Sequence, residues 1–210
     1  MRNFGRILIT AFLLSFVERA WSQNDTTAVD LLGELNAQQE EVPLLPNSML
    51  ITQRILWGQH GAMRSFKKFE LTPENRQNEL KLRRAMFIAH QVMGFATLGG
   101  MIGQGIVGSR LYDGNYDVKD LHEGLAVAVN AGYFTTAGLS LFSPPKAVDE
   151  RKGYSSIKAH KLLAVLHMSG MILTNVLADK ASDPDFKPYH RAAAFTAFGA
   201  YAASILVIKF

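Results

Sequence analysis

Apolar residues gather in four blocks between residues 85 and 208, whereas residues 23–84 are mostly polar and charged. Each block follows a histidine and holds about 18–20 mainly apolar residues, which is roughly 27–30 Å of helix. The blocks are apolar on all sides, which argues against an amphipathic bundle in water. The pattern therefore predicts an all-α membrane protein with four spanning helices.

Start and stop signals predict where these helices begin and end. Thr72-Pro73-Glu74 combines a hydroxyl cap, a proline at the first helical position and an acid in the first turn. Ser143-Pro144-Pro145 ends the second helix. Short loops make neighbouring helices antiparallel. We expect residues 72–210 to form an antiparallel four-helix transmembrane bundle, with helices at about 73–108, 118–142, 156–178 and 188–209.

Residues 1–22 are typical of a signal peptide. Arg2 and Arg6 precede an apolar run of 11 residues, Ile7–Val17, and small residues suited to a cleavage site follow at Ala20 and Ser22. The run is too short to cross about 30 Å of hydrocarbon, so cleavage is favoured over a short signal anchor.

Residues 23–71 are predicted to form a polar tether and then an interfacial amphipathic segment. Residues 23–47 show little periodicity, which is typical of a tether. A spanning helix at 48–66 would bury Arg54 at a cost of about 2.5–3.5 kcal/mol. A short N-terminal amphipathic extension at the membrane surface, with Trp57 at the headgroups, fits better.

One histidine heads each apolar block, and the antiparallel order places these four residues in two layers. His90 and His160 fall near one membrane face, and His122 and His190 near the other. A haem held edge-on between two helices needs one imidazole on each side of its iron. The sequence thus predicts that these four histidines are iron ligands for two haems, although each could instead be an interfacial residue.

Two further residues are candidates for haem binding. His167 lies seven positions after His160, on the same helical face. We expect His160 to be the ligand and His167 to hydrogen-bond near the haem, with the reverse assignment left open. Arg191, next to His190, is the expected partner of a haem propionate.

A glycine also follows each lead histidine by nine or ten positions. These glycines could allow close contact between helices or make room for the haem macrocycle. They are Gly99 or Gly100, Gly132, Gly170 and Gly199.

Composition narrows the chemistry. The chain of 210 residues has no cysteine, which excludes disulfides, thiolate ligands, iron–sulfur clusters and covalent haem attachment. A net charge of +4 gives no reason to expect nucleic acid, and the basic residues beside the apolar blocks suit lipid headgroups.

The four-helix core with one histidine per helix resembles the cytochrome b561 family over about residues 84–210. The Lys158-Ala159-His160 and Pro188-Tyr189-His190 starts of the last two helices are similar in character to that family's helices. The resemblance implies two b-type haems, ligated by alternating helices, and electron transfer across the membrane. The chain differs from fuller members, which have flanking transmembrane helices or a sensor domain, and it has no clear ascorbate-binding motif.

The function expected from these patterns is transmembrane electron transfer by a di-haem b-type cytochrome. A small molecule such as a quinol, or a protein, would donate or accept electrons, and a homodimer stays open. Alternatives are a single-haem anchor for a partner oxidoreductase and a non-redox transport or assembly subunit.

The expected location is a bacterial inner membrane, but two signals disagree on orientation. A cleaved signal peptide puts the N-terminal tail outside the cytoplasm, which we favour. The positive-inside rule favours the reverse, because Lys and Arg number 13 in residues 48–84 and 143–161, against five in 109–120 and 179–191.

Overall fold

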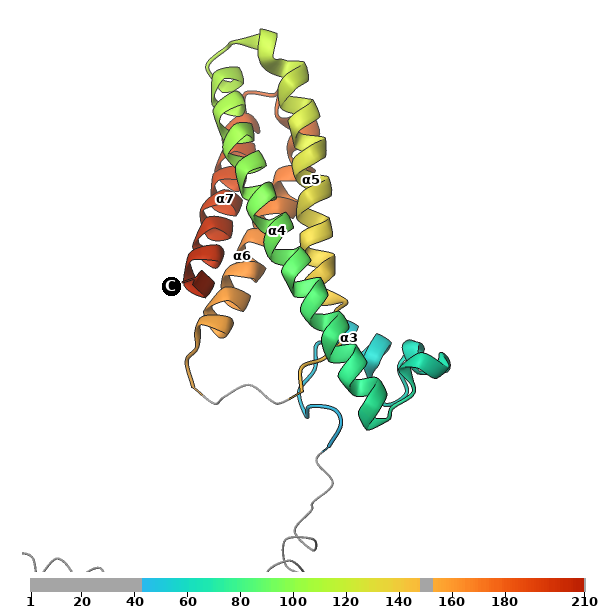
Figure 1. Cartoon of the computed structure of the whole chain (residues 1–210). Coiled ribbons are helices and arrows are strands. Elements are labelled where there is room, and N and C mark those ends of the chain that lie inside the picture. The colour runs from blue at the N-terminus through green and yellow to red at the C-terminus, as the bar shows by residue number, and fades with distance from the viewer. Residues whose placement is uncertain (1–42, 148–152, 210) are drawn as a thin grey trace, which may run out of the picture. The chain divides into compact units, whose positions relative to one another are not determined.

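The computed structural model describes residues 43–147 and 153–209, so the predicted signal peptide and most of the predicted tether lie outside the described residues. From Leu44 onward the chain forms one unit. Its described part holds five α-helices, four short 3-10 helices and no strand. The α-helices are α3 (Ile51–Trp57), α4 (Pro73–Tyr112), α5 (Lys119–Leu141), α6 (Ser156–Val176) and α7 (Lys187–Lys209) (Figure 1).

The start of α4 confirms the predicted helix signal. The Thr72 side chain accepts a hydrogen bond from the backbone N–H of Asn75 at 3.2 Å, and Pro73 is the first helical residue. The end of α4 lies at Tyr112, four positions beyond the predicted end near Gly108. The glycines inside α4 do not stop it; the chain reverses after Asp113 at Gly114, whose φ of 98° suits glycine.

The four long helices pack mainly as two pairs, α4 with α5 and α6 with α7 (Figure 1). Gly170 allows close packing in the second pair, because a Cβ there would lie 3.1 Å from Ala197. One buried cluster joins all four helices. Its members are Met101, Val129, Tyr133, Met171, Ala197 and Tyr201. A reciprocal pair of 2.9 Å amide hydrogen bonds between Asn130 and Asn175 adds a link from α5 to α6.

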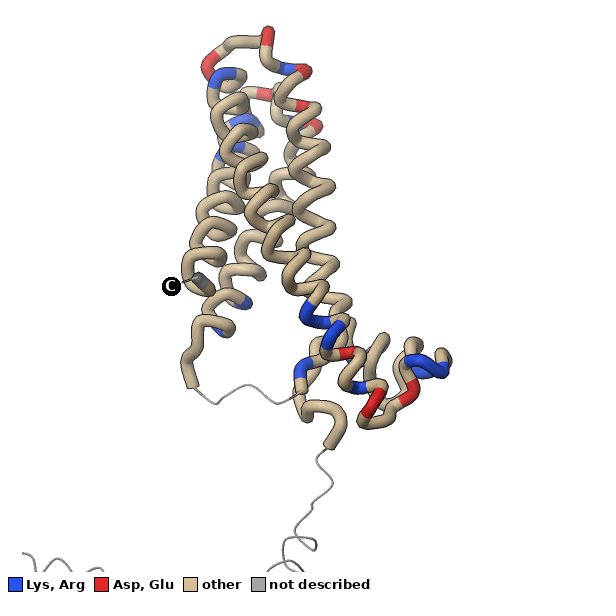
Figure 2. Tube along the Cα trace, in the orientation of Figure 1, with Lys and Arg blue, Asp and Glu red and all other residues tan. Residues whose placement is uncertain are grey.

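Three helices of the described part are long and apolar enough to cross a membrane, which supports a membrane protein. They span Pro73–Tyr112, Tyr116–Leu141 and Lys187–Ile208. The prediction of four such helices is met for three, and α6 is not among them. The apolar residues of α6 are interrupted by polar ones, which include Lys158, Lys161 and two histidines. Charged residues gather near the two ends of the long helices, and the stretches between are nearly free of them (Figure 2).

Helix α3 docks onto the end of α5. The Trp57 indole N–H donates to the Phe142 carbonyl at 2.9 Å, and the Thr52 hydroxyl donates to the Leu141 carbonyl at 2.6 Å. Trp57 is therefore buried against protein, in edge contact with Phe69 at 5.2 Å, and is not presented to headgroups as the sequence had indicated. The opposite face of α3 is apolar and exposed at Ile51 and Ile55.

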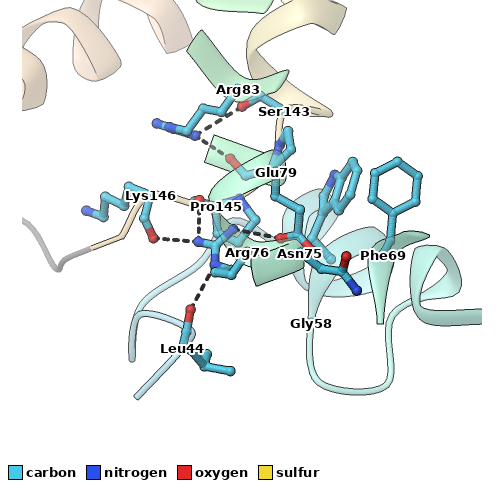
Figure 3. A network of polar contacts seen from close by, with 12 residues as sticks. Leu44, Gly58, Phe69, Asn75, Arg76, Glu79, Arg83, Ser143, Pro145 and Lys146 are labelled. Atoms are coloured by element: carbon cyan, nitrogen blue, oxygen red, sulfur yellow. Dashed lines mark hydrogen bonds and ion pairs between the residues drawn. The ribbon is translucent and has the colours of Figure 1, made fainter. Parts of the chain in front are cut away.

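A buried arginine–glutamate cluster, formed by Arg64, Arg76 and Glu79, joins this N-terminal part to α4 (Figure 3). The Glu79 side chain is fully buried and pairs with both guanidinium groups. Arg76 also donates to the carbonyls of Leu44 at 2.8 Å and Pro145 at 2.6 Å. Because these partners are far apart in the sequence, the cluster fastens the residues before α3 and the residues after α5 to the same turn of α4.

Candidate functional site

His90 on α4 and His160 on α6 face one another. Their ring centroids are 6.4 Å apart and their ring planes are inclined by 78°. Both side chains are half-buried. The structure thus brings together the two residues that the sequence paired, from helices that belong to different packed pairs.

Hydrogen bonds to backbone carbonyls fix both of these rings. His90 Nδ1 lies 2.8 Å from the carbonyl oxygen of Thr136, and His160 Nδ1 lies 2.9 Å from that of Ser204. A carbonyl oxygen only accepts, so in each neutral ring Nδ1 carries the proton. The Nε2 atom keeps its lone pair, which is the tautomer of a metal-binding histidine.

The remaining two lead histidines are less alike. His190 Nδ1 lies 3.0 Å from the Thr174 carbonyl, so this ring is fixed in the same way as His90 and His160. His122 instead contacts a side chain: its Nε2 lies 3.4 Å from Gln104 Nε2, and its Nδ1 is buried without a hydrogen-bond partner.

A regular spacing relates the four histidines to their partners, which are Thr136, Gln104, Ser204 and Thr174. Each partner follows the histidine of its own helix by 14 positions (136 minus 122, for example). In an α-helix 14 residues rise about 21 Å. The contacts therefore lie at two depths along the helices, His90 and His160 at one and His122 and His190 at the other.

His167 lies midway between these depths and has different partners. Its Nδ1 lies 2.6 Å from the Tyr133 hydroxyl, and its ring is in edge contact with Tyr133 at 5.6 Å and Tyr201 at 5.0 Å. It is buried in the helix core, whereas His160 has the ring contact with His90. The geometry thus favours His160 over His167 as the partner of His90.

Arg191, the residue predicted to hold a propionate, lies against aromatic rings. Its guanidinium carbon is 4.2 Å from the centroid of Tyr112 and 5.6 Å from that of Phe195. The Lys187 ammonium lies over the same Tyr112 ring at 4.4 Å. These cations form one basic group beside the last turn of α4, and the propionate role of Arg191 stays a prediction.

The glycines that follow the histidines separate into two kinds. A Cβ at Gly100 would lie 3.1 Å from Val129, and one at Gly132 would lie 2.8 Å from Thr97, so both positions serve close contact between α4 and α5. A Cβ at Gly99 or Gly199 would meet nothing within 4 Å.

An apolar groove of about 190 Å³ also lies between α4 and α5, at depths between the two histidine layers. Its lining includes Met93, Thr97, Gly100, Leu125, Val129 and Gly132.

Comparisons with protein-family models, with curated proteins and with solved structures give no match for this chain. Within the described residues, no group of three or more His, Cys, Asp or Glu side chains is arranged to hold a metal ion. A haem iron takes four ligands from its macrocycle and two from side chains. A haem site therefore requires two facing histidines and not a group of three.

Sequence reasoning did not identify Gln104 or the carbonyls of Thr136, Thr174 and Ser204 as partners of the histidines. The regular spacing of 14 positions could have located them once the helices were paired in antiparallel order.

Proposed function

We propose that this chain is a transmembrane electron-transfer protein with two b-type haems, resembling cytochrome b561. His90 and His160 would be the axial ligands of one haem, and His122 and His190 those of the other. The observation that carries the proposal is the His90–His160 pair, with rings 6.4 Å apart and each Nδ1 bonded to a carbonyl.

The separation of this pair suits an iron atom between the rings. An imidazole nitrogen binds a metal at about 2 Å and lies about 1 Å from its ring centroid, so two axial rings have centroids about 6 Å apart. The carbonyls of Thr136 and Ser204 direct the protons away from the shared space. This orientation is what second-shell partners of metal-binding histidines provide.

The proposal includes α6 as a fourth spanning helix in an antiparallel bundle. Its outward residues support this assignment, since Leu162 is 73% exposed and Val165 is 66% exposed. Large apolar side chains at such exposure suit contact with lipid. The polar residues that lower the hydropathy of α6 include His160 and His167, which point inward to ring partners on other helices.

Bis-histidine ligation limits the chemistry to electron transfer. A haem bound by either histidine pair would supply one-electron transfer. The two pairs lie about 21 Å apart along the helices, within a membrane core of about 30 Å. The apolar helices keep water and charged reactants out of this space. Basic residues at both ends suit lipid headgroups. The expected electron donor or acceptor is a quinol or a protein.

The test is the haem content of the purified full-length chain, measured as the pyridine haemochrome. We expect two haems per chain, with one lost in His90→Ala, His160→Ala, His122→Ala or His190→Ala. His60→Ala is the matched control, because His60 is exposed and lies outside the long helices. His167→Ala should keep both haems. A colourless protein, or full haem content in all four ligand variants, would contradict the proposal.

A single-haem protein is the second candidate, and the contacts of His122 favour it. His122 is the one lead histidine without a carbonyl partner, and its Nε2 is engaged by Gln104. This alternative predicts one haem per chain, lost in His90→Ala and His160→Ala but kept in His122→Ala.

A further inference from the structure

His122 differs from the other three lead histidines in the atom that it uses for its hydrogen bond. His90, His160 and His190 use Nδ1, at 2.8 to 3.0 Å from a carbonyl oxygen, and keep Nε2 free. In His122 the contact is at Nε2, to the Gln104 side chain. The nitrogen needed for ligation is therefore already occupied at one position of four.

The backbone of α4 supports this arrangement of His122. A Cβ at Gly108 would lie 2.9 Å from His122 Cε1 and 3.2 Å from Nδ1, so the ring rests directly on the helix at that glycine. Gln104 stands one helical turn earlier, on the same face as Gly108. Gly108 thus makes space for the ring while Gln104 contacts its far nitrogen.

This arrangement leaves polar atoms unsatisfied. His122 Nδ1 and Gln104 Oε1 are both buried without a hydrogen-bond partner. The Gln104 contact, at 3.4 Å, is also longer than the bonds of the other three histidines. A long contact between groups with unmet hydrogen bonds holds the ring weakly, so a competing ligand can displace it.

We propose that Gln104 is a positioning residue that competes with iron for His122 Nε2, which makes the His122/His190 site the weaker of the two haem sites. This inference rests on the proposed function. The His90/His160 site needs no rearrangement, whereas His122 must leave Gln104 before it can ligate. A site whose groups must first be released binds more weakly than a preorganised one.

The size of the effect follows from the bond that must be broken. One net hydrogen bond corresponds to a factor of roughly 3 to 10 in affinity. Replacing Gln104 by leucine, which fills a similar volume and has no polar group, should therefore tighten haem binding at the second site by about that factor. The first site, about 21 Å away along the helices, should not respond.

The experiment is a titration of full-length protein, prepared without haem, with haemin. His90→Ala leaves the second site alone, and His122→Ala leaves the first. We expect the His90→Ala protein to bind haemin more weakly than the His122→Ala protein. Adding Gln104→Leu should strengthen binding in the His90→Ala background and leave the His122→Ala background unchanged.

Gln91→Leu is the matched control, because Gln91 is an exposed glutamine on the same helix as Gln104. In the His90→Ala background it should leave second-site affinity unchanged. Unchanged or weaker second-site binding with Gln104→Leu would overturn the role of Gln104, while two working sites would still support the haem function. No haemin binding in either single-site protein would refute the haem function itself, and the inference with it.

Discussion

Replacing Glu79 should open the N-terminal part of the protein, because this carboxylate is the single anion of the buried arginine–glutamate cluster. Its side chain is fully buried, and the side chains of Arg64 and Arg76 are only 9% and 5% exposed. Glu79→Leu would leave two buried guanidinium groups without a counter-charge.

The loss of stability in Glu79→Leu depends on which hydrogen bonds Arg64 and Arg76 retain. Arg76 retains bonds to the carbonyls of Leu44, Pro145 and Lys146, and Arg64 retains those to Gly58 and Phe69. Their hydrogen bonds are thus largely conserved, while the charge pairing is lost. Removing one partner of a buried ion pair costs about 3–5 kcal/mol. Glu79→Gln keeps an acceptor oxygen, so its cost should be about 1.5–3 kcal/mol, the value of a charge-assisted bond.

Hydrogen exchange read by mass spectrometry measures this effect locally. A loss of about 3 kcal/mol corresponds to a factor of roughly 100 in the opening equilibrium. We expect amide protection in residues 51–72 to fall by about that factor in Glu79→Leu and by less in Glu79→Gln. Peptides from α7 are the internal control. Glu74→Gln, at an exposed position in the first turn of α4, should lower protection only slightly.

The reasoning fails if Glu79→Leu leaves protection of residues 51–72 at the wild-type level. That result would mean that the carbonyl bonds of Arg64 and Arg76 alone hold the N-terminal part to α4. Equal losses of amide protection in Glu79→Leu and Glu74→Gln would also refute the reasoning. They would show that the burial of Glu79 does not matter for stability.

Two further predictions concern the helix core and can be checked by thermal unfolding in detergent micelles. Tyr133→Phe should destabilise the protein by about 1–3 kcal/mol, because it removes the hydroxyl that lies 2.6 Å from the buried Nδ1 of His167; an unchanged melting temperature would show that His167 finds another partner. Gly170→Ala should cost about 1–3 kcal/mol, because its Cβ would press against Ala197 at 3.1 Å. The control is Gly103→Ala, whose Cβ would meet nothing within 4 Å and which should not destabilise; similar losses at both glycines would remove packing as the cause.

Local patterns in the sequence were sufficient to place the helices. The cap at Thr72 and the stop at Ser143-Pro144-Pro145 correspond to real helix ends, since both act on the adjacent turn. The predicted end of α4, near Gly108, was less accurate, because the helix continues to Tyr112. A glycine inside an apolar helix does not by itself end the helix. The predicted starts of α6 and α7, near residues 156 and 188, were accurate to within one residue.

The choice between His160 and His167 needed the tertiary structure. Seven residues are two helical turns, so both side chains lie on one face of α6 and periodicity cannot separate them. The difference comes from the neighbouring helices, which place the Ser204 carbonyl beside His160 and the Tyr133 hydroxyl beside His167. The arginine–glutamate cluster could not be predicted from the sequence either, because Arg76 donates to the carbonyl of Pro145, 69 positions away.

The sequence by itself determined the elements of this protein: apolar helices, their antiparallel order and one histidine at the start of each apolar block. These properties depend on residues within a few turns of each other. Tertiary structure decided that His90 faces His160 and which nitrogen each ring keeps free. It also decided that His122, unlike His90, His160 and His190, makes its hydrogen bond to a side chain. Such contacts depend on how far each helix is rotated about its axis and on which neighbour it packs against. No local pattern encodes those quantities, because they arise from packing the whole chain at once.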